Sequence, residues 1–146
     1  LGLTFSWGIP LGWTAATGTL PDAAIFCIYA GSVAWVFGYD TIYAVQDMTD
    51  DAAVGIKSSA LAFTGHLYSA VGVAYGLAIL LLSLGLFLKL GVDLWVFRVG
   101  LMGLHLAHQL HQLENTNAAT ALRLFRSNRD AGLILALALL LIRLFD

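Results

Sequence analysis

The stretch that decides the fold is GYDTIYAVQDMTDDAAVGIKSSA, residues 38–60, which ends an apolar run and holds four aspartates within twelve positions. If it is helical, at about 100° per residue, its acids gather on an arc of about 100°. That arc holds Asp40, Tyr43, Asp47, Asp50 and Asp51. A carboxylate costs about 2.5 to 3.5 kcal/mol near the centre of a bilayer. The pattern therefore predicts one continuous helical face of acids that projects into a wet cavity or the membrane interface.

The composition around this stretch indicates a membrane protein. Of the 146 residues, 60% are hydrophobic and 11% are charged, and the mean hydropathy is +0.85. A soluble domain has about 45 to 50% apolar and about 25% charged residues, so this chain lacks the polar side chains to cover a water-facing surface. The net charge of −2, without a basic stripe, argues against nucleic acid as a partner. The expected solvent is the lipid bilayer.

The apolar runs predict an all-α, polytopic transmembrane helix bundle. A spanning helix needs about 20 apolar residues, and continuous runs favour helices over the alternating pattern of a β-barrel. The first candidate is expected to be kinked, because it contains Pro10 and several glycines. The five candidates are residues 1–20, 23–39, 67–88, 94–113 and 131–145.

Two polar stretches, residues 40–59 and 114–130, are separated by two predicted spans and so should lie on one side of the membrane as loops. They contain four of the seven basic residues, Lys57, Arg123, Arg126 and Arg129. The positive-inside bias places these loops in the cytoplasm. We therefore expect an integral protein of a bacterial inner membrane with its site facing the cytoplasm.

Carboxylates that share one helix face repel one another and are relieved by cations. Mg²⁺ suits them, because it takes one or two carboxylates and fills its other positions with water and phosphate oxygens. The pattern thus indicates a phosphorylated ligand, whereas a solvated acidic cap on a span end is the alternative. A Ca²⁺ loop is less well supported, since the D-x-D-x-D-G order is missing.

The acidic stretch closely resembles the UbiA family of membrane prenyltransferases. The pattern YDTxYAxxDxxDDxxxGIKS is matched from Tyr39 to Ser58, and the branch it matches best prenylates 4-hydroxybenzoate in ubiquinone synthesis. The resemblance implies nine spans in which two Asp-rich motifs face each other across a cavity. Residues 1–146 would supply spans five to nine, the C-terminal part of one domain. The family's first motif, NDxxD, does not occur here, so the chain alone is expected to be inactive without the missing N-terminal spans.

The resemblance also implies a role for each residue of the motif. The reaction would transfer a polyprenyl group from its allylic diphosphate to 4-hydroxybenzoate, with Mg²⁺ assisting departure of the diphosphate. Asp40, Asp47 and Asp51 would hold Mg²⁺ as catalytic residues, and Asp50 would support them. Lys57 would meet the diphosphate or, equally, anchor the topology. Tyr43 would orient a phosphate oxygen or an aspartate, and Ser58 would contact phosphate or, preferably, cap the next helix.

Other interpretations stay open at this point. The chain could belong to a haem O, menaquinone or lipid synthase of the same family, or be a fragment of a transporter or non-catalytic subunit. His105, His108, Gln109 and Gln112 share a helix face, which suits a metal or haem, but hydrogen bonds between helices are favoured. The three arginines are interpreted as a topology signal that touches anionic lipid, with diphosphate binding as the lesser alternative.

Overall fold

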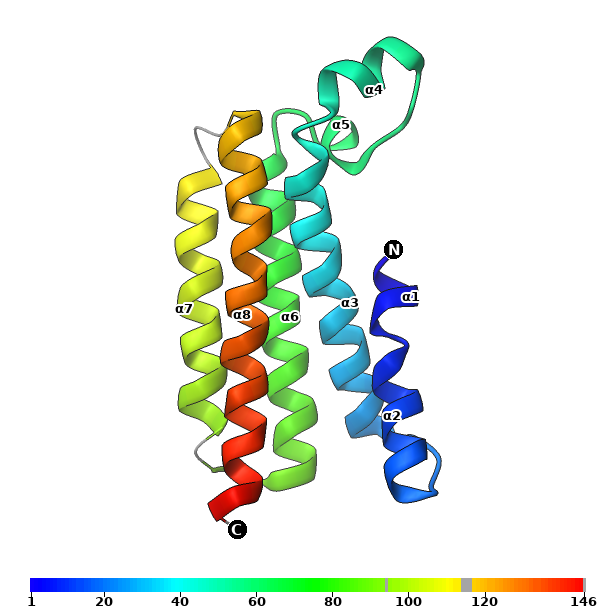
Figure 1. Cartoon of the computed structure of the whole chain (residues 1–146), viewed down its shortest axis with the longest axis vertical. Helices are drawn as coiled ribbons and strands as arrows, with labels where there is room; N and C mark the ends of the chain where they lie inside the picture. Colours follow the sequence, from blue (N-terminus) through cyan, green and yellow to red (C-terminus); the bar gives the residue numbers. More distant parts are fainter. Residues whose placement is uncertain (94, 114–116, 146) are drawn as a thin grey trace.

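The described part of the computed structural model comprises residues 1–93, 95–113 and 117–145, and it confirms the all-helical class (Figure 1). The elements are α1 (Gly2–Ser6), α2 (Gly8–Thr17), α3 (Ala23–Ala44), α4 (Met48–Val54), α5 (Ser59–Ala62), α6 (Leu67–Leu90), α7 (Trp95–Leu113) and α8 (Ala118–Phe145). Four long helices, α3, α6, α7 and α8, form a bundle, while α1 and α2 lie along α3 (Figure 1).

The bundle closes because each long helix packs on two others. α3 packs along α6, α6 on α7, α7 on α8 and α8 back on α3. The core between them includes Ile42, Leu82, Met102 and Leu106, each at most 2% exposed. Small residues bring α3 and α6 together, as at Gly31, where an added Cβ would lie 2.9 Å from the backbone nitrogen of Leu82. Such close approach is how helices associate in lipid, where apolar burial alone gives little driving force.

Within residues 1–93, 95–113 and 117–145, two helices, α3 and α6, are long and apolar enough to cross a membrane, judged by length and composition. They correspond to the second and third predicted spans. The first segment is broken, as expected, but at Trp7, between α1 and α2, and not at Pro10. Pro10 sits in the first turn of α2, where its missing N–H leaves no hydrogen bond unmade.

The prediction that residues 114–130 form a loop is wrong for most of that stretch, because α8 begins at Ala118. Asn117 starts the helix by accepting a hydrogen bond from the backbone N–H of Thr120 at 2.9 Å. Ala121, Leu124 and Ala131 are buried at helical spacing against the bundle. The second predicted span likewise continues beyond residue 39, to Ala44. Arg123, Arg126 and Arg129 therefore project from a helix.

Candidate functional site

The acidic stretch does not form one continuous helix, so that prediction is wrong. α3 ends at Ala44, three residues turn the chain, and α4 begins at Met48. Asp40 belongs to α3, Asp47 precedes α4, and Asp50 and Asp51 lie in its first turn. The break has a local reason. Acidic side chains in a first turn favourably meet the positive end of the helix dipole, which stabilises a new helix start here.

The four aspartates are not gathered into a metal cluster. Among the described residues, no group of three or more Asp, Glu, His or Cys side chains could hold a metal ion. Asp40, Asp50 and Asp51 make no side-chain hydrogen bond or ion pair within this part of the chain, and Asp47 only accepts a 3.5 Å contact from Gln46. The donor set therefore does not fit a cation site built by this chain alone, and Mg²⁺ binding stays a prediction.

The segment after α4 is positioned by a glycine and a serine cap. Gly55, at φ +75°, ends α4, and its N–H bonds the Asp51 carbonyl. Ser58 accepts a hydrogen bond from the backbone N–H of Leu61 at 3.5 Å, so the capping interpretation of this residue is confirmed. Thr41 donates to Ser59 Oγ at 3.0 Å, which ties α5 to α3. Lys57, which lies between Gly55 and Ser58 in the sequence, is exposed. Its role toward a diphosphate stays a prediction.

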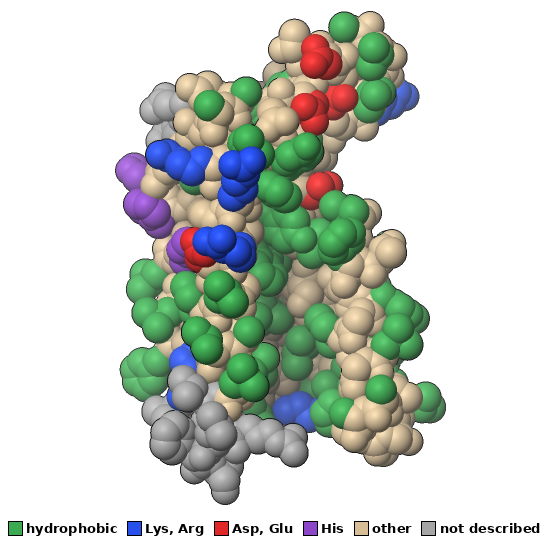
Figure 2. Space-filling view, in the orientation of Figure 1, with side chains coloured by type: hydrophobic (Ala, Val, Ile, Leu, Met, Phe, Trp, Pro, Cys, Tyr) green, Lys and Arg blue, Asp and Glu red, His purple; other side chains and the backbone are tan. Residues whose placement is uncertain are grey.

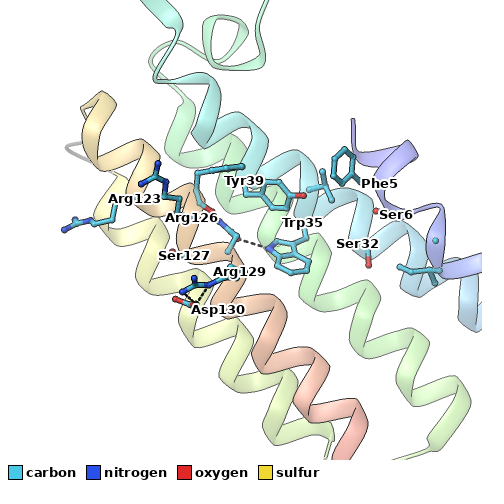
Figure 3. Close-up of a pocket in the computed structure, with 15 residues that line it drawn as sticks. Phe5, Ser6, Ser32, Trp35, Tyr39, Arg123, Arg126, Ser127, Arg129 and Asp130 are labelled. Carbon is cyan, nitrogen blue, oxygen red and sulfur yellow. Dashed lines mark hydrogen bonds and ion pairs between the residues drawn. The ribbon is translucent and has the colours of Figure 1, made fainter. Parts of the chain in front are cut away.

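Residues 38–60, with their four aspartates, are called the acidic segment below. A cavity of about 950 Å³ lies next to its first residues, between α1, the start of α2, α3 and α8 (Figure 3). None of the four aspartates lines it, contrary to the expectation of a cavity that receives their side chains, but Tyr39, the residue before Asp40, does. Its lining comprises Phe5, Ser6, Gly8, Ile9, Ser32, Trp35, Val36, Tyr39, Arg123, Phe125, Arg126, Ser127, Asn128, Arg129 and Asp130.

Aromatic rings form a connected row on the α3 and α8 sides of this cavity. Trp35 meets Tyr39 edge to face, with ring centroids 5.9 Å apart. Tyr39 meets Phe125 at 5.7 Å, and Tyr43 lies 4.9 Å from the same phenyl ring. Such pairs favour fixed relative orientations. The predicted substrate residue Tyr43 is thus part of the row.

Basic side chains occupy the α8 side of the cavity. Figure 2 shows Lys and Arg over the first half of α8 and Asp over the acidic segment at the same end of the molecule. Arg123 donates to Gln112 Oε1 at 3.1 Å, and Arg129 pairs with Asp130 at 2.9 Å. Arg126 is exposed and makes no hydrogen bond or ion pair within the described ranges. The rim thus carries positive charge that can meet an anionic group.

A second polar feature, a buried network, escaped the sequence analysis. Asn128, 6% exposed, accepts a hydrogen bond from the indole N–H of Trp35 at 2.9 Å. Its amide nitrogen donates to Gln109 Oε1 at 3.2 Å, and the hydroxyl of Tyr75 donates to the same oxygen at 2.8 Å. Gln109, 1% exposed, donates in turn to Ser127 Oγ at 2.8 Å. The signal was available, since Asn128 continues the apolar spacing of the buried α8 face.

The histidine cluster makes hydrogen bonds, as favoured from the sequence. His105 Nε2 lies 3.0 Å from the backbone oxygen of Ser127, a contact between α7 and α8. His108 Nε2 lies 2.6 Å from the amide nitrogen of Gln112 within α7. The metal interpretation of this cluster finds no support, because no metal-binding group occurs in the described part of the chain.

The arrangement can hold a planar aromatic molecule or an allylic chain between rings, with an anionic group at the rim. A buried hydroxyl, Ser6 Oγ, lines the same cavity and has no hydrogen-bond partner in the described structure. Buried polar atoms are nearly always hydrogen-bonded. This hydroxyl can therefore bond a polar atom of a ligand in the cavity.

Comparison with known proteins identifies close relatives. The mitochondrial 4-hydroxybenzoate polyprenyltransferase of Rattus norvegicus is 40% identical over 150 residues, which cover 99% of this chain and 39% of the relative. The 4-hydroxybenzoate octaprenyltransferase of Azotobacter vinelandii is 38% identical over 97% of this chain and 48% of its own length. That of Vibrio parahaemolyticus is 34% identical, with 96% of this chain and 49% of the relative covered.

The chain thus spans less than half of the length of these relatives. No solved structure matches it. The model of the UbiA prenyltransferase family matches residues 1–142, nearly the whole chain, including the acidic segment, the aromatic row and most of α8. The motif, the helical bundle and this match agree: the chain belongs to the UbiA prenyltransferase family, whose members are polytopic membrane proteins.

Proposed function

We propose that the chain is the C-terminal part of a longer membrane enzyme that transfers a polyprenyl group from an allylic polyprenyl diphosphate to 4-hydroxybenzoate. The names of the relatives support the substrates. One structural observation carries the proposal: a cavity with aromatic side chains and a basic rim is lined by Tyr39, the first residue of the family motif. Residues 1–146 supply only part of the site, so turnover requires the N-terminal spans.

The cavity suits a reaction that passes through a carbocation. The allylic carbon–oxygen bond breaks, its electron pair leaves with the diphosphate, and a ring carbon of the acceptor attacks the allylic carbon and then loses its proton. The ring of Tyr39, which lines the cavity, would stabilise positive charge on the prenyl group.

The leaving diphosphate accumulates negative charge, and basic side chains at the rim would meet it or the acceptor carboxylate. Arg126 and Lys57 are both exposed, and neither makes a hydrogen bond or ion pair within the described ranges. Family members generally use Mg²⁺, and we include a Mg²⁺ requirement in the proposal. Among the described residues, Asp40, Asp47, Asp50 and Asp51 form no metal cluster, so the carboxylates that would complete a Mg²⁺ site are expected from the N-terminal spans.

We propose a location in a bacterial inner membrane, with the acidic segment at the cytoplasmic face. The family is a membrane family, and relatives occur in both bacteria and mitochondria. In the bundle, the acidic segment and the start of α8 lie at the same end (Figure 1), as the expected topology requires. The other acceptors of the family have less support, since the relatives compared are named for 4-hydroxybenzoate.

The proposal is tested with the full-length protein in liposomes that contain a polyprenyl diphosphate and Mg²⁺. The expected product is prenylated 4-hydroxybenzoate, detected by mass spectrometry. Matched reactions offer haem or the naphthoate precursor of menaquinone instead. Product from one of these acceptors, with none from 4-hydroxybenzoate, would assign the protein to another branch of the family. No product from any acceptor would refute the enzymatic proposal.

A further inference from the structure

Asn128 is bonded to all four helices of the bundle. Its carboxamide oxygen accepts from Trp35 on α3 at 2.9 Å and contacts the hydroxyl of Tyr75 on α6 at 3.5 Å. Its amide nitrogen donates to Gln109 on α7 at 3.2 Å and to the Leu124 carbonyl on its own helix at 3.1 Å. A buried amide with donors and acceptors satisfied on every side holds one orientation, because rotating it would break several bonds at once.

One of these bonds reaches the cavity. Trp35 lines it, and the dashed line in Figure 3 marks the indole bond that fixes its ring. The indole ring meets Tyr39 nearly at a right angle, and the Tyr39 ring in turn meets Phe125. Without the bond, the partly buried indole N–H would lack its acceptor, and the ring would be free to turn toward another.

The other arm of the network points away from the cavity. Tyr75 is 4% exposed, lies on α6 and does not line the cavity between α1, α3 and α8. Its hydroxyl bonds Gln109 at 2.8 Å. Tyr75 and Trp35 thus both contact the carboxamide oxygen of Asn128, and of these two side chains only Trp35 lines the cavity.

We propose that Asn128 is a positioning residue that fixes Trp35 as the wall against which the aromatic acceptor stacks. This inference rests on the proposed function. It assigns Asn128 a role in the affinity for the acceptor and none in the affinity for the prenyl donor. A purely structural role of Asn128 makes a different prediction, because the loss of any bond in the network would then change the acceptor KM by a similar factor.

The test uses the full-length protein with N128L, W35F, N128D and Y75F variants, assayed with 4-hydroxybenzoate and a polyprenyl diphosphate. N128L and W35F should each raise the acceptor KM about five- to tenfold, the range of a lost aromatic contact, and leave the donor KM unchanged. The double variant should be no worse than the worse single variant, because both remove the same bond. N128D keeps an acceptor for the indole and should restore the acceptor KM.

Y75F is the matched control. It removes a buried hydroxyl from the same amide network, so it should lower the stability while leaving the acceptor KM within about twofold of the unchanged protein. A second readout is the indole N–H resonance of Trp35 in ¹⁵N-tryptophan-labelled protein, identified by its loss in W35F. This resonance should shift and exchange faster in N128L but not in Y75F.

An unchanged acceptor KM in an active N128L enzyme, or an unchanged Trp35 resonance, would overturn the positioning role. Equal increases in N128L and Y75F would also overturn it, since they indicate general loosening of the bundle. If the unchanged protein transfers nothing to 4-hydroxybenzoate, the proposed function itself fails. The two failures are therefore distinguishable.

Discussion

The buried network and the acidic segment differ in whether their polar side chains have hydrogen-bond partners. In the network, Asn128 and Gln109 have partners on both ends of their amides, all within this chain. In the acidic segment, Asp40, Asp50 and Asp51 have no side-chain hydrogen bond or ion pair in the described structure. The first region is completed by the fold, so the loss of a bond within it should cost stability, and only the bond from Asn128 to Trp35 should also affect acceptor binding. The second is a set of repelling charges, whose loss should cost function.

The largest expected effect is that of Asp47→Asn or Asp51→Asn in the full-length protein. Prenyl transfer should fall by about 10²-fold or more, because in the proposed function each of these carboxylates helps to hold the cation that offsets the leaving diphosphate. The melting temperature should stay within about 2 °C, since neither side chain supports the bundle. Initial rates at limiting Mg²⁺ and thermal melting in detergent measure both quantities.

The matched control is Asp22→Asn, at the other end of α3. Asp22 pairs with Lys89 at 2.5 Å. The substitution Asp22→Asn should therefore lower the stability slightly and leave the rate of prenyl transfer unchanged. Normal turnover by Asp47→Asn at limiting Mg²⁺, or an equal loss of activity in Asp22→Asn, would contradict the claim that the aspartates of the acidic segment serve prenyl transfer.

A smaller effect, on stability, is expected from Gln109→Leu. The change leaves the Tyr75 hydroxyl and the Asn128 amide without their shared acceptor. It should lower the free energy of unfolding by about 1 to 2 kcal/mol, at the upper end for hydrogen bonds between membrane helices. Unfolding in mixed micelles measures it, with the exposed His111→Ala as control.

The rate of transfer by folded Gln109→Leu protein should stay within about threefold of the unchanged rate, because the bond between Asn128 and Trp35 remains. A variant of full stability with greatly reduced transfer would reverse the roles assigned to the two regions.

The smallest effect concerns pH. The hydrogen bond from Lys89 lowers the pKa of Asp22 from its ordinary 3.8, and the backbone N–H of Ile25 adds to this. Because the folded pKa is the lower one, the stabilisation is present above about pH 4 and disappears as the pH falls through the folded pKa. The gap in stability between the unchanged protein and Asp22→Asn should therefore narrow between pH 6 and pH 3. A gap that widens on acidification would contradict this sign.

The sequence was a good guide to the apolar helices and to the family, because long apolar runs and the motif from Tyr39 to Ser58 are unambiguous signals. It was a poor guide to the two polar stretches. The helical spacing of the aspartates continues across residues 45–47, where the chain turns. Spacing alone carries no information on such a break, which depends on backbone hydrogen bonds and on the helix dipole at Met48.

The start of α8 was missed for a different reason. Three arginines made residues 114–130 look like a loop, yet Ala121, Leu124 and Ala131 already show the buried face of a helix. Asn128 lies on the same buried face, so its position fits the helical spacing although its polar side chain interrupts the apolar pattern. The cavity wall was not foreseeable, because Trp35 and Asn128 lie 93 positions apart and only the packing of α3 on α8 brings them together.

The most direct test of the central claim, that this chain supplies one part of a shared site, is reconstitution in liposomes with and without the N-terminal spans of the full-length protein. 4-Hydroxybenzoate, a polyprenyl diphosphate and Mg²⁺ are present in both reactions. The account predicts prenylated product only when both segments are present, because four aspartates with Lys57 as their nearest cation in sequence cannot alone offset a diphosphate. Robust product formation by residues 1–146 alone would contradict it.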